Sequence, residues 1–377
     1  MKRIVFILAV PLLVLTACGQ SRSGSGPGTI SLTAQQAALG RPEYFPRRIW
    51  AACDFELLRK DVVWTGELEH DNIPAYPGNS TALRARPAGP GGLRFLSVKP
   101  VSYPRMGGKN QVYFRYFIRG ASSLTLEIFN LDRNDSHRVR VSGLRQGAWS
   151  ETTLDFSAAQ ASGPVRGLIV QGERMNDLIF NVEPAREGID CELVVDDVVC
   201  FSDDPEPQKV NEPFPRRVIC VWDFDVLDYY HPWTHDHYQV LRQGEPLEND
   251  WGVCRAVANP ENPDKRIRLV IDPPQAVGES TKLRFRYFLV SSAGLQVQIF
   301  DLTDLDNRHI VLPETGQGAW HWSILDFTRD GIKNNGLQTP FEAGNLVDDI
   351  FFLPRQAPGK EAELLIDEVV LYDAYSD

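Results

Sequence analysis

Apolar and polar residues alternate along most of the chain after residue 44. In Leu124-Thr125-Leu126-Glu127-Ile128-Phe129 positions 124, 126 and 128 are apolar, and Leu295-Gln296-Val297-Gln298-Ile299 repeats the pattern. A period of two is typical of strands with one buried face. Leu178-Ile179-Phe180 and Ile350-Phe351-Phe352-Leu353 are short continuous apolar runs, which suit interior strands. Polar turn residues separate the runs and helical periodicity is absent, so the pattern predicts an all-β fold.

The strand pattern occurs twice because the chain contains an internal repeat. Phe114-Arg115-Tyr116-Phe117 returns as Phe285-Arg286-Tyr287-Phe288, a shift of 285 − 114 = 171 residues. The same shift maps Gln146-Gly147-Ala148-Trp149 onto Gln317-Gly318-Ala319-Trp320. The repeat therefore predicts two similar domains of ordinary size.

A second repeated motif marks the start of each copy. Phe45-Pro46-Arg47-Arg48 reappears as Phe214-Pro215-Arg216-Arg217, a shift of 214 − 45 = 169 residues. A polar, proline-containing stretch separates the copies and reads as a linker. The predicted organisation is a signal peptide at 1–17, a lipidated cysteine and flexible linker at 18–43, a first sandwich at 44–202, a linker at 203–212 and a second sandwich at 213–377.

The N-terminal residues have the order of an export signal. Met1-Lys2-Arg3 is basic, the run from Ile4 to Leu15 is apolar except at Pro11, and Leu15-Thr16-Ala17-Cys18 follows. The apolar run is too short for a bilayer span, which needs about 20 residues. The tetrad resembles the lipobox of bacterial lipoproteins, which implies cleavage before Cys18 and lipidation of its thiol. We therefore expect an exported chain anchored in the cell membrane or outer membrane and facing the periplasm or exterior; plain secretion is the alternative.

Charge narrows the range of partners. Removing Lys2 and Arg3 leaves 39 − 2 = 37 basic against 50 acidic residues, a net charge near 37 − 50 = −13. A surface this acidic repels phosphate backbones, which argues against nucleic acid as a partner.

Five cysteines remain besides Cys18, namely Cys53, Cys191, Cys200, Cys220 and Cys254. An odd number leaves at least one thiol free, and no spacing resembles a zinc site. Buried thiols are the favoured interpretation, and one bridge from Cys53 to Cys191 or Cys200 is the alternative.

The ends of each copy carry acidic motifs. Each copy opens with Asp54-Phe55-Glu56 or Asp223-Phe224-Asp225 and closes with Val195-Asp196-Asp197-Val198 or Ile366-Asp367-Glu368-Val369. Together with the repeated middle segments, these motifs resemble the jelly-roll carbohydrate-binding modules, the galactose-binding-like domains often attached to glycoside hydrolases. The resemblance covers nearly all of both copies. It implies two tandem jelly-roll β-sandwich domains.

The acidic motifs form the first candidate site. First and last strands of a jelly roll are neighbours, so the opening and closing carboxylates could meet at one sheet edge, where oxygen ligands suit calcium. The related modules often hold a structural calcium there, so the resemblance implies one here. The alternative is that the carboxylates cap turns or pair with Arg48 or Arg217. The metal-ligand candidates are Asp54, Glu56 and Asp196 in the first copy and Asp223, Asp225 and Asp367 in the second.

Aromatic residues form the second candidate set. Sugars stack their apolar faces on flat rings, and rings in polar loops have little core to join. Glu151 stands where the second copy has Trp322, so the copies are not expected to bind identically. Trp149 and Trp320 enter strands at equivalent positions and are predicted to be core residues. The ligand-contact candidates are Tyr230, Trp233, Trp251 and Trp322.

A histidine cluster from His231 to His237 is the third candidate. On a strand, His235 and His237 would point to one side, which suits a transition metal. The cluster has no counterpart in the first copy and no evident fourth ligand. A polar loop beside a ligand cleft and a plain solvated loop are the alternatives.

Catalytic motifs are absent from the sequence, including nucleophile elbows, phosphate-binding glycine loops and zinc-protease motifs. The sequence therefore predicts a non-catalytic, lipid-anchored, extracytoplasmic protein that binds a polysaccharide or glycan, or attaches to a surface. One alternative is a structural or partner-binding lipoprotein without sugar affinity. The other is a divergent glycan hydrolase, which would need a deep pocket with convergent carboxylates.

Overall fold

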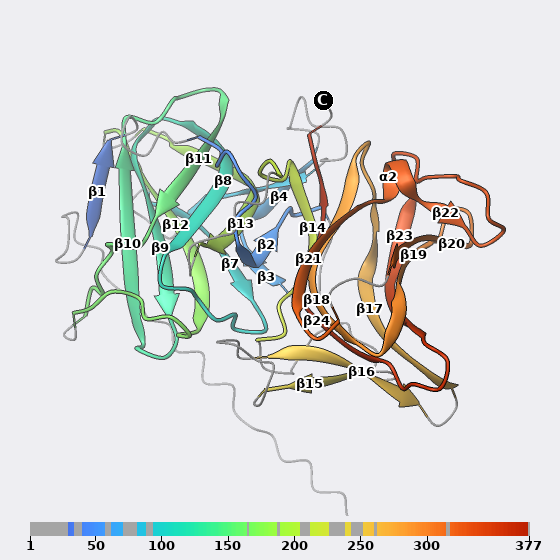
Figure 1. Cartoon of the computed structure of the whole chain (residues 1–377). Coiled ribbons are helices and arrows are strands. Elements are labelled where there is room, and N and C mark those ends of the chain that lie inside the picture. Colours follow the sequence, from blue (N-terminus) through green and yellow to red (C-terminus); the bar gives the residue numbers. More distant parts are fainter. Residues whose placement is uncertain are drawn as a thin grey trace, which may run out of the picture.

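Two β-sandwiches lie side by side in the computed structural model (Figure 1). The structure describes residues 29–33, 40–56, 62–70, 81–87, 93–163, 166–186, 189–203, 212–225, 238–242, 252–259, 262–313 and 317–375. The predicted signal peptide, Cys18, Tyr230, Trp233, Trp251, the histidine cluster and most of the linker at 203–212 lie outside these residues.

The first copy contains two sheets. One has the order β11-β8-β13-β5-β4, with β2 also paired to β13; the other has the order β10-β9-β12-β7-β3, with β6 also paired to β7. Its strands are β2 (Arg48–Cys53), β3 (Val62–Thr65), β4 (Glu67–His70), β5 (Thr81–Arg84), β6 (Arg86–Pro87), β7 (Arg94–Pro100), β8 (Asn110–Arg119), β9 (Ala121–Asn130), β10 (Asp135–Ser142), β11 (Trp149–Asp155), β12 (Met175–Pro184) and β13 (Glu192–Ser202).

The second copy repeats this arrangement. The order β21-β18-β24-β16 forms one layer and β17-β23-β19-β20-β22 the other, and pairing of β16 with β17 joins them; β14 pairs with β24 and β15 with β16. Its elements are β14 (Arg217–Trp222), β15 (Tyr238–Leu241), β16 (Val253–Asn259), β17 (Asn262–Ala276), β18 (Thr281–Val290), β19 (Ser292–Asp301), β20 (Asp306–Pro313), β21 (Trp320–Asp326), α2 (Phe327–Asp330), β22 (Ile332–Lys333), β23 (Leu346–Gln356) and β24 (Glu363–Asp373).

Strand order identifies the fold. In the first copy the chain crosses repeatedly between the layers, which places β11-β8-β13-β5 opposite β10-β9-β12-β7. In the second copy β21-β18-β24-β16 lies opposite β20-β19-β23-β17. This is the strand order of a jelly roll. The predicted fold class, two tandem jelly-roll sandwiches, is confirmed.

Each copy has its own apolar core. On β9, Leu124, Leu126 and Ile128 are fully buried within one cluster. On β19, Leu295, Val297 and Ile299 are fully buried within another. The residues between them are half-buried, so the predicted alternation is confirmed in both copies.

A third core lies between the copies. β13 is buried along almost its whole length because its two faces enter different cores. Val198 and Cys200 belong to the core of the first copy, whereas Val199 and Phe201 face the second copy. The third core contains Phe45, Ile49, Tyr113, Val199, Phe201, Phe214, Val218, Val370, Tyr372 and Ala374.

Ring contacts in this third core follow the repeat. Phe45 packs edge-on against Tyr372, with ring centroids 4.8 Å apart. The equivalent pair is Phe214 with Phe201, at 5.7 Å. Each copy therefore gives one phenylalanine to the other and receives one, so the two sandwiches meet about an approximate two-fold axis.

Part of the predicted N-terminal linker is a strand. Ile30–Thr33 forms β1, which pairs in parallel with β10 from Ile30↔Val139 to Thr33↔Ser142 (Figure 1). Ile30 and Leu32 pack against the first core. The prediction that all of 18–43 is a flexible linker is therefore wrong at these residues. The segment is too short for its alternation to be distinguished from chance.

Two further expectations concern the cysteines and the membrane. Cys53, Cys191, Cys200, Cys220 and Cys254 are all buried and take part in no disulfide, so the bridge considered from Cys53 does not form. Within the described ranges, no helix has the length and hydropathy needed to span a bilayer.

Candidate functional site

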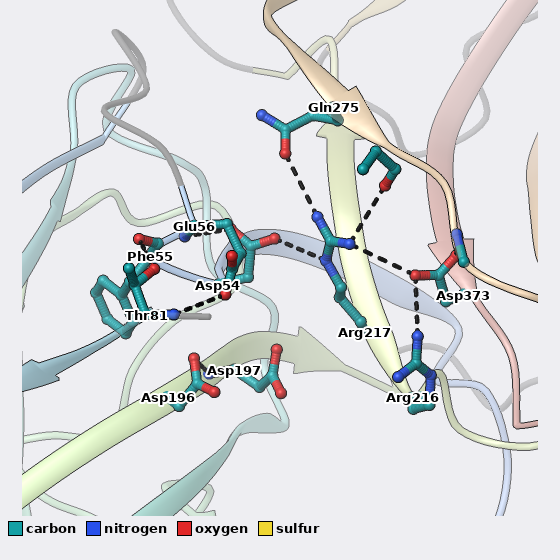
Figure 2. Close-up of polar contacts among 12 residues, drawn as sticks. Asp54, Phe55, Glu56, Thr81, Asp196, Asp197, Arg216, Arg217, Gln275 and Asp373 are labelled. Atoms are coloured by element: carbon teal, nitrogen blue, oxygen red, sulfur yellow. Dashed lines mark hydrogen bonds and ion pairs between the residues drawn. The ribbon is translucent and has the colours of Figure 1, made fainter. Parts of the chain in front are cut away.

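The repeated Phe-Pro-Arg-Arg motif ties the two copies together. Arg48 on β2 donates from Nε at 3.0 Å and from Nη2 at 2.6 Å to Oδ2 of Asp223, and its Nη2 lies 2.9 Å from Oδ2 of Asp225. In return, Arg217 on β14 donates from Nε to Oδ2 of Asp54 at 3.0 Å (Figure 2). All five side chains are almost completely buried. We call these contacts the reciprocal clamp.

Electrostatics favour the charged form of both clamp arginines. Burial by itself lowers the pKa of a guanidinium, but the carboxylates of Asp223 and Asp225 outweigh this effect and raise the pKa of Arg48. Burial is likewise outweighed at Arg217, whose pKa is raised by Asp54 and Asp373. Removing one partner of such a pair would leave an uncompensated buried charge, which is costly.

The clamp uses three of the predicted metal ligands. The cation that faces Asp54, Asp223 and Asp225 is a guanidinium, as the alternative hypothesis expected, but it comes from the other copy. The expected proximity of first and last strands is confirmed, since β2 pairs with β13 and β14 with β24.

The other three predicted ligands have separate partners. Oε1 of Glu56 accepts from the Thr81 amide at 3.1 Å, and Oδ1 of Asp196 accepts from the Asp197 amide at 2.8 Å. Oδ2 of Asp367 accepts from Arg286 at 2.9 Å. Over the described residues, no three His, Cys, Asp or Glu side chains converge as a metal site would require. Calcium stays a prediction, and the oxygens as placed serve guanidinium and amide groups.

A pocket of about 610 Å³ opens beside this junction. Its walls come from three parts of the chain: the segment before β2, strands β8 and β11 of the first copy, and the residues after β24 of the second copy. The lining residues are Arg41, Arg115, Trp149, Ser150, Glu151 and Tyr375.

Trp149 is in the wall of this pocket and lies outside the main core of the first copy. It is half-buried, packs with Phe117 against the small cluster of Ala82 and Val194, and has its ring centroid 6.2 Å from that of Phe117. Leu154 on the same strand points into the core and lies five positions after Trp149, an odd offset, so Trp149 faces outward. Trp320 is also half-buried, with Arg286 over its ring at 4.4 Å. The prediction that both tryptophans are core residues is wrong.

Arg115 forms the floor of the pocket. Only 2% of its side chain is exposed. Nη1 pairs with Oδ2 of Asp197, Nε lies 3.5 Å from Oε1 of Glu151, and Nη2 donates to the Arg216 carbonyl oxygen at 2.9 Å. These contacts on three sides fix the plane of the guanidinium.

The outer wall is held by a stacking contact between the segment before β2 and the segment after β24. The guanidinium carbon of Arg41 lies 3.8 Å from the centroid of the Tyr375 ring, within the range of a cation–π contact. Thr153 on β11 donates to the Gly40 carbonyl oxygen at 2.7 Å, which fixes the neighbouring backbone to the first copy. The pocket is thus a built feature with two aromatic rings and several polar groups.

Trp322 is the one predicted ligand-contact residue within the described part. It is half-buried on β21, and the Arg284 guanidinium lies 3.8 Å from its ring centroid and 4.6 Å from that of Phe45. Burial lowers the pKa of Arg284 to about 10. Trp322 therefore covers a buried cation at the junction. The structure does not bring it into the pocket of Trp149.

Sequence reasoning missed both the clamp and the pocket. The clamp had a signal, since both the arginines and the Asp-Phe-acid motif repeat. The sequence analysis, however, placed the opening carboxylates of each copy against the closing carboxylates of the same copy, and not against an arginine of the other copy. The pocket had a weaker signal: Trp149 and Glu151 lie on one face of a strand whose other face supplies Leu154.

Comparison with known proteins supports no family assignment. No family model matches the chain, and no curated protein matches it. Similar solved structures include the tandem CBM22 domains from Xyn10C of Paenibacillus barcinonensis, with 11% identity, coverage of 88% of this chain and 99% of that one, and a TM-score of 0.33.

Two other solved structures are also similar to this chain. The tandem CBM51 modules of the family 98 glycoside hydrolase Sp3GH98 from Streptococcus pneumoniae show 10% identity, coverage of 83% and 99%, and a TM-score of 0.24. A cycloalternan-forming enzyme from Listeria monocytogenes shows 9% identity, coverage of 82% and 22%, and a TM-score of 0.26. With scores this low, the fold assignment rests on the strand order described above.

Proposed function

We propose that the pocket beside Trp149 binds the end of a glycan chain. The observation that carries this proposal is a half-buried indole ring in the wall of a pocket of about 610 Å³ rich in hydrogen-bonding groups. A pyranose can stack its apolar face on such a ring while its hydroxyls reach Ser150 and Glu151. The volume lies within the range of roughly 300–1,000 Å³ typical of small-ligand sites.

The charges around the pocket favour a neutral sugar. Arg115 is already paired with Asp197, and the remaining charged groups of the lining, Arg41 and Glu151, have opposite sign. An acidic sugar would gain little from a site without net positive charge.

The proposed role of the pocket is to bind a glycan without cleaving it. Glycoside hydrolysis uses two carboxyl groups held about 5 to 9.5 Å apart. Among the described residues that line this pocket, Glu151 is the one carboxylate. Together with the lipid anchor expected at Cys18, this supports a glycan-binding or surface-attachment role outside the cytoplasm.

The test uses residues 19–377 and a panel of soluble β-glucan, xylan, mannan and galactan, with polygalacturonate as the acidic comparison. Retardation in affinity gels identifies a ligand, and calorimetry measures its affinity. We expect Trp149→Ala to weaken binding by about tenfold or more, which corresponds to about 1.4 kcal/mol.

Trp320→Ala is the matched control, since it makes the same change at the equivalent position of the second copy. It should leave the affinity unchanged. Failure of the unaltered protein to bind any polysaccharide of the panel would overturn the proposal in favour of a structural or partner-binding role. Unchanged binding by Trp149→Ala would exclude this pocket as the site.

A further inference from the structure

We propose that the second copy is a component of the first copy's glycan site: Tyr375 contacts the bound sugar, and the reciprocal clamp positions the pocket floor. This inference rests on the proposed function of the Trp149 pocket. It identifies one ligand-contact residue and one set of positioning residues that lie outside the sandwich carrying Trp149.

Tyr375 supplies the outer wall from the second copy. It follows directly after Ala374 and three residues after Tyr372, both of whose side chains are in the third core. Its position against Trp149 therefore depends on the docking of the two sandwiches. The stack with Arg41 holds the ring at the pocket mouth, 3.8 Å from the guanidinium carbon.

The pocket floor is also tied to the second copy. Arg115 donates to the backbone carbonyl of Arg216 at 2.9 Å. Arg216 is the residue before the clamp arginine Arg217, and its amide donates to the Asp373 carbonyl at 2.8 Å. A path of contacts therefore runs from the pocket through Arg115 and Arg216 to the next residue, Arg217, and its buried pair with Asp54. Figure 2 shows the part of this path that contains Arg216, Arg217 and Asp54.

In the described part of the second copy, the equivalent positions are built differently. The Arg47 carbonyl oxygen accepts from Arg284 at 3.2 Å, but Arg284 stands at the position of Tyr113, and Arg286, the equivalent of Arg115, pairs with Asp367 at 2.9 Å. Trp322 stands at the position of Glu151 and stacks on Arg284 at 3.8 Å. An indole thus covers the junction cation Arg284 on that side, whereas the first copy has a carboxylate at this position, 3.5 Å from Arg115 in the pocket wall.

Coupling follows from thermodynamic linkage. A ligand that contacts both copies favours the docked arrangement by the same factor by which docking raises its affinity. Weakening the clamp should therefore weaken glycan binding, even though no clamp residue lines the pocket.

The experiment measures the affinity of residues 19–377 for the β-glucan, xylan, mannan and galactan panel. We expect Tyr375→Ala to lower the affinity about fivefold, and Arg217→Gln to lower it by a similar factor. A fivefold loss corresponds to about 1 kcal/mol.

Arg268→Gln is the matched control for Arg217→Gln. It breaks an ion pair with Asp349 at 2.7 Å within the second copy, away from the pocket. It should bind normally. Tyr375→Ala changes a residue at the end of the chain, so it tests the proposal even if Arg217→Gln fails to fold.

The outcomes separate the two proposals. If Trp149→Ala loses binding while Tyr375→Ala and Arg217→Gln bind like the unaltered protein, the second copy has no part in the site and this inference is overturned. If Trp149→Ala also binds normally, the proposed function of the pocket fails first.

Discussion

His137 is a buried, neutral side chain in the first copy. Its Nδ1 lies 2.8 Å from the Ala159 carbonyl oxygen, and the residue is completely buried. Burial lowers its pKa, because the charged imidazolium is disfavoured away from water. The equivalent position, 137 + 171 = 308, is Arg308, whose charge is matched by Asp301 at 3.1 Å. This repeat position is therefore charged in the second copy, where Asp301 pairs with Arg308, and neutral in the first copy, where His137 stands.

Acid should destabilise the first copy through His137. Below the ordinary histidine pKa near 6.5 the unfolded chain takes up a proton that the folded chain resists, so the free energy of unfolding falls between about pH 7 and pH 5. In His137→Gln this part of the pH dependence should disappear. Urea unfolding across that range measures it. His321→Gln, at a half-buried residue of β21, is the control, and equal slopes in all three proteins would contradict the assignment.

Strands β10 and β20 are equivalent in sequence position but differ in burial. On β10, Val139 and Val141 are 0% and 1% exposed. On β20, the equivalent Ile310 and Leu312 are half-buried, and Val311 is 39% exposed. β1 accounts for the difference, since it covers the outer edge of β10, whereas the described strand on the outer edge of β20, β22, pairs only at Arg308 and His309.

Removal of β1 should make the two edges alike. Deleting residues 29–33 exposes Val139 and Val141, so we expect the free energy of unfolding to fall by about 2 kcal/mol. Amide hydrogen exchange over 139–142 should rise toward that of 310–313. Deletion of the preceding residues 19–28 is the control for tether length. Unchanged exchange on β10 would show that β1 contributes nothing to that edge.

The sequence predicted those strands whose burial depends on their own copy. Alternation in Leu124 to Ile128 identified a half-buried strand because one face meets the core and the other meets solvent. It did not explain β13, because the second face of that strand is buried by residues of the other copy, such as Phe214 and Val370. Trp149 was assigned to the core because it occupies the same repeat position as Trp320. The alternation of buried and exposed residues along its strand indicates the outward face instead. β1 was missed because four residues carry too little pattern.

The two sandwiches form one structural body. A ten-residue apolar core and a reciprocal set of buried ion pairs join them. Independent domains usually meet through smaller and more polar surfaces. The sequence predicted two domains with separate cores, which is correct, but it gave no sign that they are fastened to each other.

We predict a single unfolding transition for the complete chain. Unfolding of either sandwich would expose the third core and leave the buried clamp charges without their partners, so the two sandwiches should unfold together. Arg48→Gln combined with Arg217→Gln should separate calorimetric unfolding into two transitions. The control is Arg268→Gln combined with Arg308→Gln, which lowers stability inside one copy only. Two transitions in the unaltered protein would contradict this view.

The joint between the copies has the form of a symmetric dimer interface, because the same motif is offered and received by each side. In a true homodimer every substitution would act on both sides at once. Here each contact is encoded separately, so one side can change while the other is kept. Tyr113 packs on Phe214 at 4.9 Å, whereas at the equivalent place of the other side Arg284 lies 4.6 Å from the ring of Phe45. One flank of the joint carries the pocket of Trp149, and on the other flank Trp322 stacks on Arg284. Because both copies belong to one polypeptide, the contacts on one side of the joint can change to form a binding site while the contacts on the other side keep the two sandwiches docked.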